Sequence, residues 1–95
     1  MQTKKLLFAF LNEINKENVD IKHEDFGDHI GEEEFYNVII LAHQENYITG
    51  LYYADDLPHY ERANLTMKGI EFLEENNTWA KAYRGLKELR DWLKP

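Results

Sequence analysis

The fold is decided by residues 31–65, which read GEEEFYNVIILAHQENYITGLYYADDLPHYERANL. Apolar side chains recur in the first half of this stretch at three- and four-residue spacing: Phe35, Val38, Ile39 and Ala42. That spacing predicts a helix over residues 32–45. Gly31 can cap this helix, and the glutamates at 32–34 fill a first turn in which the helix dipole favours carboxylates.

The second half of the stretch changes character. Residues 47–54 are rich in aromatic and β-branched side chains, and residues 55–58, Asp-Asp-Leu-Pro, have the composition of a turn. Residues 59–65 can return as a second strand. This pattern predicts an antiparallel β-hairpin over residues 47–65 with a loop of about four residues.

Working outward, the N-terminal flank has its own helical spacing: Leu7, Phe10, Leu11 and Ile14. We expect an amphipathic helix over residues 3–17 whose other face carries Glu13, Lys16 and Glu17. Residues 20–31 mix glycines and aspartates with single apolar anchors, which predicts a short helix or turn.

On the C-terminal flank, Thr66 is a natural N-cap for a helix running to Asn76. Gly69 lies inside this helix and is expected to weaken it by about 1 kcal/mol relative to alanine. Residues 76–78 then end that helix and cap another. The last helix is indicated by an apolar stripe: Trp79, Ala82, Tyr83, Leu86, Leu89 and Leu93.

This order of elements is typical of a winged helix-turn-helix. The prediction is one α+β domain over residues 1–95, mostly α-helical, with a small antiparallel hairpin (47–65) as the wing and C-terminal helices at 66–94. A chain of 95 residues is long enough for one core. The expected core comprises Leu7, Phe10, Leu11, Ile14, Phe35, Val38, Ile39, Ala42, Ile48, Leu65, Ile70, Leu73, Leu86 and Leu89.

Two sets of residues also resemble a known family. The first set lies around the hairpin: Asn46-Tyr47-Ile48-Thr49-Gly50, Tyr53-Ala54-Asp55-Asp56, Pro58-His59, Leu65-Thr66 and Lys68-Gly69. The second is C-terminal: Trp79, Lys81, Tyr83, Lys87-Glu88 and Asp91-Trp92. Together they resemble the YjcQ family. The resemblance implies a small winged-helix protein of bacteria or their phages, and it brings no catalytic or binding residues with it.

Composition excludes several classes of protein. With 43% hydrophobic and 31% charged residues, the chain is globular rather than disordered. The absence of cysteine excludes disulfide scaffolds, thiolate zinc sites and cysteine catalysis. The apolar run at residues 6–11 is too short for a signal peptide or a membrane span. We therefore expect a cytoplasmic protein that does not engage a membrane.

Charge is distributed unevenly along the chain, whose net charge is −7. Residues 23–61 contain ten acidic side chains and no Lys or Arg, whereas residues 1–22 and 62–95 are slightly basic. DNA affinity depends largely on Lys and Arg at phosphates. DNA binding is therefore not expected at the helix of residues 32–45, although Asn37 and Gln44 could in principle read adenine.

No catalytic or cofactor motif is visible. The four histidines lack the spacing of a helical zinc site, and the phosphate-binding, dinucleotide-binding and serine-hydrolase motifs are absent. His59 beside Asp55 and Asp56 could hold an ion, but one imidazole with two local carboxylates is incomplete coordination. Small winged-helix domains also lack the depth for an enclosed pocket of roughly 300 Å³. We expect no enzyme, cofactor, metal or small-molecule substrate.

A second side of the 32–45 helix carries a candidate interaction surface, which we call the tyrosine surface: Tyr36, Asn37, Ile40, Gln44 and Tyr47. A helix that is apolar on two sides needs two neighbours. The second neighbour could be the C-terminal helices of the same chain or an external partner.

The last helix presents a basic face: Lys81, Arg84, Lys87, Arg90 and Lys94. It could be an ordinary solvated face, a contact for a nucleic-acid backbone, or a surface that meets the acidic middle of a second copy.

These observations favour a non-enzymatic binding module that acts through protein contacts or self-association in a bacterial or phage regulatory system. Two alternatives stay open. One is a DNA-binding transcriptional regulator that uses its basic N- and C-terminal helices, and the other is an enzyme working at His59 with Asp55 or Asp56.

Overall fold

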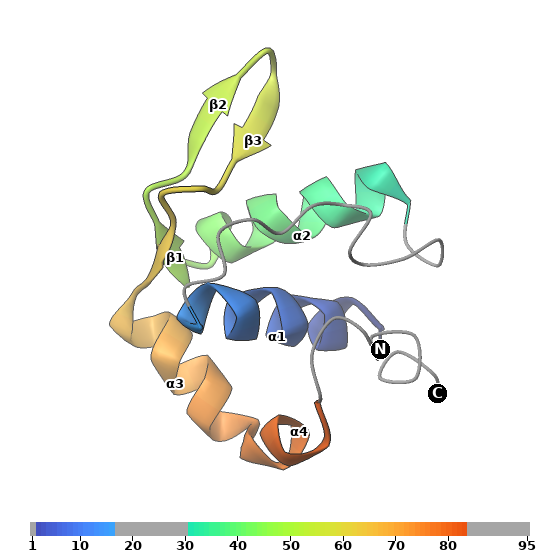
Figure 1. The fold of residues 1–95 in the computed structure, drawn as a ribbon, viewed down its shortest axis with the longest axis vertical. Coiled ribbons are helices and arrows are strands. Elements are labelled where there is room, and N and C mark those ends of the chain that lie inside the picture. Colours follow the sequence, from blue (N-terminus) through green and yellow to red (C-terminus); the bar gives the residue numbers. More distant parts are fainter. Residues whose placement is uncertain (1, 17–30, 84–95) are drawn as a thin grey trace.

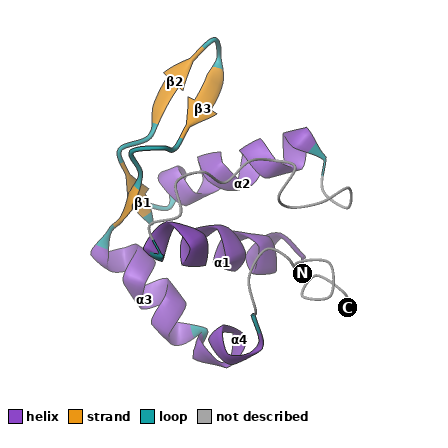
Figure 2. Cartoon of the chain, in the orientation of Figure 1, coloured by secondary structure: helices purple, strands orange, loops and turns teal. Residues whose placement is uncertain are grey.

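The computed structural model describes residues 2–16 and 31–83 (Figures 1 and 2). The elements follow in this order: α1 (Gln2–Asn15), α2 (Glu32–Gln44), β1 (Ile48–Thr49), β2 (Tyr52–Ala54), β3 (Leu57–His59), β4 (Asn64–Leu65), α3 (Met67–Glu75) and α4 (Asn77–Ala82). The prediction of a mostly α-helical α+β fold with a small antiparallel hairpin is confirmed. The short element expected at residues 20–31, which the winged-helix assignment also needs, falls almost entirely outside the described residues.

Helix α1 is the centre of the fold. It packs against α2 on one side and against α3 and β4 on the other (Figure 1). Six consecutive side chains, residues 6–11, are all buried. The expected amphipathic helix is wrong in one respect, because Glu13, assigned to the solvent face, is only 5% exposed.

Helix α2 begins and ends as its local sequence dictates. Gly31 is the N-cap, with an extended backbone at φ −69° and ψ 157°. At the other end Asn46 adopts a left-handed φ of 62°. The N–H of Asn46 donates to the carbonyl of His43, and the N–H of Tyr47 donates to that of Ala42. This pair of bonds is a Schellman motif, which satisfies the last carbonyls of the helix and turns the chain into β1.

The hairpin is present, but its tip is tighter than expected. Strands β2 and β3 pair antiparallel through a two-residue turn at Asp55 and Asp56, whose φ angles are 54° and 63°. Two left-handed residues make a type I′ turn, which matches the twist of the strands. The predicted four-residue loop is therefore wrong, because Leu57 and Pro58 belong to β3. Pro58 lies opposite Tyr53 in a position where no N–H is needed for the ladder.

The hairpin is broken into two ladders. Near its base, β1 pairs with β4, and the two ladders are separated by residues 50–51 on one side and 60–63 on the other. The longer side folds into a turn in which the N–H of Ala63 donates to the carbonyl of Tyr60 at 3.0 Å. Both of these side chains are buried. The Tyr60 ring packs edge-on against Phe10 and Phe35, at centroid distances of 5.6 and 5.9 Å, and so anchors the wing (residues 47–65) to α1 and α2.

Helix α3 begins at the predicted cap. The Thr66 hydroxyl accepts a bond from the Gly69 N–H at 3.1 Å and donates to the Asn46 carbonyl. The buried face of α3 differs from the expected one, because Phe72 is buried while Ile70 is 38% exposed. The remaining predicted core positions in this region, Leu65 and Leu73, are half-buried against the core.

Helix α4 is short. It ends at Ala82, and Tyr83 already has an extended backbone with φ −74° and ψ 121°. The expected stripe is therefore helical only through residue 82 within the described residues, and Leu86, Leu89 and Leu93 lie outside them. Among residues 2–16 and 31–83, no helix has the length and apolarity needed to cross a bilayer.

Candidate binding surfaces

The tyrosine surface is divided by the fold. Tyr36 and Ile40 are half-buried on α2, and Asn37 and Gln44 are exposed. Tyr47 lies beyond the end of α2, where its ring packs on Phe72 of α3 at 5.0 Å. The single stripe expected from helical spacing therefore does not form, because the Schellman motif after residue 44 takes Tyr47 off the helix.

The tip of the wing has two different faces. Side chains alternate across paired strands, so Tyr52 shares one face with His59, and Tyr53 shares the other with Pro58. Pro58 is buried, and β3 packs against α2. Tyr53 is 56% exposed on the same face as Pro58. Tyr53 is therefore an exposed aromatic side chain on the same face of the wing as the buried Pro58.

The other face of the wing carries a closed polar cluster. The rings of Tyr52 and His59 stack at 5.1 Å, and Arg62 lies over Tyr52 at 5.8 Å. The Tyr52 hydroxyl donates to Glu61 at 3.1 Å, and the Nδ1 of His59 lies 3.5 Å from the other Glu61 oxygen. The pKa of Glu61 is lowered, first by a bond from its own backbone N–H and then by Tyr52 and His59.

This cluster gives His59 other partners than the enzymatic alternative at the wing expects. His59 directs its ring nitrogens to the Ala54 carbonyl and to Glu61, rather than to the side chains of Asp55 or Asp56. In the described part of the chain, no three His, Asp or Glu side chains are grouped so that they could hold a metal ion. His59 is therefore not paired with either of the aspartates that the enzymatic alternative assigned to it.

The acidic character of the middle of the chain is displayed at the surface. Between Gly31 and Glu61, the carboxylate residues with described side chains are all exposed: Glu33, Glu34, Glu45, Asp55, Asp56 and Glu61. Of the predicted basic face, Lys81 is exposed on α4, and Arg84, Lys87, Arg90 and Lys94 lie outside the described residues.

A buried polar contact joins α1 to the end of α4. The Tyr83 hydroxyl donates to the Glu13 carboxylate at 2.7 Å, and Lys16 lies 3.8 Å from the same oxygen. Burial and the Glu13 carboxylate together raise the pKa of Tyr83 far above its usual range. Glu13 is therefore a structural carboxylate that holds α4 against α1.

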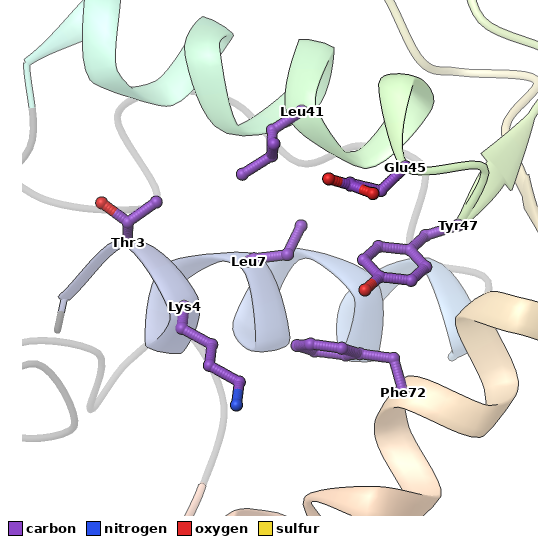
Figure 3. A pocket seen from close by; sticks show the side chains of 7 residues that line it. All are labelled: Thr3, Lys4, Leu7, Leu41, Glu45, Tyr47 and Phe72. Carbon is purple, nitrogen blue, oxygen red and sulfur yellow. The ribbon is translucent and has the colours of Figure 1, made fainter.

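An open groove of about 410 Å³ lies between α1, α2 and α3 (Figure 3). Its apolar lining comes from Leu7, Leu41 and Phe72. The polar lining comes from two places: Thr3 and Lys4 in the first turn of α1, and Glu45 with Tyr47 after α2. The groove is open to solvent, so it does not contradict the expectation that the fold lacks an enclosed pocket.

Comparison with known proteins identifies the family. The profile of the family described as YjcQ protein matches residues 3–92. The chain belongs to the YjcQ family. Its YjcQ relatives include the "Uncharacterized protein YjcQ" of Bacillus subtilis (strain 168), which is 40% identical over 96 residues, covering 99% of this chain and all of that protein.

A solved YjcQ structure has a similar fold. The solution NMR structure of the YjcQ protein from Bacillus subtilis matches with a TM-score of 0.68 at 38% identity, covering 78% of this chain and 95% of the other. The predicted resemblance to the YjcQ family is therefore confirmed.

Sequence reasoning missed the groove of this YjcQ protein for a physical reason. Its lining residues are separated by up to 69 positions, since Thr3 and Phe72 line the same space. Only the packing of three helices brings them together. One signal was present in the sequence: Asn46 followed by a tyrosine at the end of α2 is compatible with a left-handed helix terminus, which removes Tyr47 from the helical stripe.

Proposed function

We propose that this protein is a non-enzymatic binding module that recognises a basic protein surface through the acidic surface of α2 and the wing. The acidic surface consists of Glu33, Glu34, Asp55, Asp56 and Glu61. One observation carries the proposal: residues 31–61 contain no Lys or Arg, and these five carboxylate side chains are exposed. Such a mainly negative surface, with Arg62 beside it over the Tyr52 ring, attracts oppositely charged partners and repels phosphates.

Apolar groups within the same region support a protein partner. Tyr53 is 56% exposed, and Tyr36 and Ile40 are half-buried on α2. Tyrosine is enriched in protein interfaces because it buries a large apolar area at a small cost in conformational entropy. Acidic groups around exposed tyrosines suit a basic partner surface that also carries apolar side chains.

Site-specific photo-crosslinking tests this proposal. A benzophenone amino acid replaces Tyr53 or Asn37 one at a time, and a matched control carries it at Glu74, which is exposed on α3. In cells that make this protein naturally, we expect adducts from positions 53 and 37 but not from 74. The adducts should weaken when Glu33 and Glu34 are both changed to Lys, because the charge attraction is then reversed.

Two results decide against the proposal. Equal adducts at all three positions would indicate unselective contact, and adducts that strengthen in the lysine variant would indicate an acidic partner. An adduct between two copies of this chain would identify the basic partner as the protein itself.

A further inference from the structure

The groove between α1, α2 and α3 presents charges of opposite sign at its two ends. Lys4 contributes an ammonium group from the first turn of α1, and Glu45 contributes a carboxylate from the end of α2. Leu7 lies between them along the floor, and the Tyr47 hydroxyl points into the same space (Figure 3). The groove is therefore apolar along its length and charged at its ends.

These polar groups have few partners of their own. No hydrogen bond or ion pair joins the side chains of Glu45 or Tyr47 to another residue in the described part of the chain. Burial, and after it the charges of Glu45 and Glu75, raises the pKa of the Tyr47 hydroxyl. The Lys68 ammonium lies over the Tyr47 ring, 5.6 Å from its centroid. Lys4 has an aromatic neighbour, the ring of Trp79 at 5.6 Å. Residues bearing a carboxylate, a hydroxyl and an ammonium group thus line one groove.

We propose that this groove binds a short apolar peptide with free termini, whose carboxylate pairs with Lys4 and whose ammonium group pairs with Glu45. A volume of about 410 Å³ lies within the range of small-molecule sites. Leu7, Leu41 and Phe72 would bury the side chains of the peptide. The Tyr47 hydroxyl would add a hydrogen bond near its amino end.

The separation of the two charges selects a peptide over a single amino acid. An α-amino acid carries its ammonium and carboxylate groups on one carbon, whereas Lys4 and Glu45 belong to different helix ends on either side of Leu7 (Figure 3). Each added residue extends a peptide by about 3.3–3.6 Å. A dipeptide or tripeptide therefore separates its charges along the groove while its side chains remain on the apolar floor.

NMR titration of the ¹⁵N-labelled protein tests the proposal. The probes are leucyl-leucine, its N-acetyl form, its C-terminal amide and glycyl-glycine. We expect saturable shifts of the Leu7, Leu41 and Glu45 amide signals with leucyl-leucine. Blocking either terminus should weaken binding by roughly two- to fivefold, the effect of losing one solvent-exposed ion pair. Glycyl-glycine should cause no saturable shift, because it has no apolar side chain to bury.

Charge variants show which side chain of the groove binds which terminus of the peptide. In Glu45→Gln, leucyl-leucine and its N-acetyl form should bind equally, because the partner of the ammonium group is gone. In Lys4→Gln, leucyl-leucine and its amide should bind equally. Glu34→Gln and Lys81→Gln are matched controls, since both residues are exposed and lie outside the groove, and both variants should retain full discrimination.

Three results would overturn the proposal: no saturable shift with leucyl-leucine, equal affinity for all four probes in the unmodified protein, or unchanged discrimination in the Glu45 and Lys4 variants. Glu45 and Lys4 are exposed, so neither substitution threatens folding, and an unchanged spectrum in the absence of peptide verifies this. Glu45 lines the groove and is not part of the acidic surface. Photo-crosslinking from Tyr53 should therefore persist in Glu45→Gln, which keeps the two proposals distinguishable.

Discussion

At the scale of single residues, the contact between Tyr83 and Glu13 carries the clearest dependence on pH. The pKa of Tyr83 is raised in the folded protein by burial and by the Glu13 carboxylate. Because this pKa is higher in the folded than in the unfolded protein, the protonated phenol stabilises the folded state. Its contribution to stability is therefore complete below the unfolded pKa of about 10 and is lost as the pH rises above that value.

Replacing this tyrosine tests the linkage. We expect Tyr83→Phe to lower the free energy of unfolding by about 1–3 kcal/mol at neutral pH, because a buried carboxylate loses a donor. The variant should also lose less stability than the wild type between about pH 9 and 11. Urea unfolding followed by circular dichroism measures both effects. Tyr53→Phe is the control, and a parallel pH dependence in Tyr83→Phe and the wild type would contradict the assignment.

Gly69 shows why a residue that weakens a helix can still be required there. A Cβ atom at this position would lie 2.2 Å from the Tyr47 carbonyl oxygen. Helix propensity alone predicts that Gly69→Ala stabilises the protein by about 1 kcal/mol. We expect the opposite, a loss of about 1–3 kcal/mol from overpacking. In thermal melts, Gly31→Ala provides the comparison, since no atom lies within 4 Å of its added Cβ; a more stable Gly69→Ala would show that the backbone relaxes.

At the scale of elements, the turn of the wing allows a test with two opposite outcomes at one position. Asp56 has a φ of 63°, which glycine adopts freely and alanine does not. Asp56→Gly should raise the stability of the protein by a few tenths of a kcal/mol, and Asp56→Ala should lower it by about 1 kcal/mol. Chemical denaturation measures the difference between the two variants. Equal stabilities would argue against a type I′ turn.

Helices with long periodic apolar stripes were predictable from the sequence. The residues that are buried only through packing between distant elements were not. The spacing from Phe35 to Ala42 identifies α2 correctly, and Thr66 identifies the start of α3. The sequence does not show which side of α3 is buried, because Ile70 and Phe72 are both apolar. Packing of Tyr47 against α3 decides that Phe72 is the buried one. Tyr60 was likewise missed, since only the break in the hairpin turns it into the core.

The candidate sites were less predictable than the fold. Spacing on an ideal helix placed Tyr47 beside Ile40, but the left-handed Asn46 separates them. The wing histidine was paired with the two aspartates nearest to it in sequence, whereas strand pairing places it on Tyr52. Both errors arise because the backbone changes direction where the sequence pattern assumes continuity.

At the scale of the whole molecule, charge predicts how the protein behaves towards DNA. The exposed carboxylates of α2 and the wing repel a duplex within about 8 Å at an ionic strength of about 0.15 M. We expect no binding of random duplex DNA by micromolar protein under these conditions in fluorescence anisotropy. Any binding at low salt should disappear when Lys81, Arg84, Lys87 and Arg90 become Gln, and it should survive Asn37→Ala. Tight binding at about 0.15 M salt that depends on Asn37 or Gln44 would restore the DNA-binding alternative.

The break between the two ladders of the wing has a consequence for local opening. The base ladder is tied to the body by the buried side chains of Ile48, Tyr60 and Ala63. The tip ladder has three residue pairs beyond Gly50, whose φ is 87°, and of these six residues only Pro58 is buried. Segments with few buried apolar contacts open more often than the core. Amide hydrogens of Ala54 and Leu57 should therefore exchange with solvent far faster than those of Ile48 and Leu65. The wing would then behave as two cooperative units, with a tip that can open and rearrange on a partner while its base stays closed.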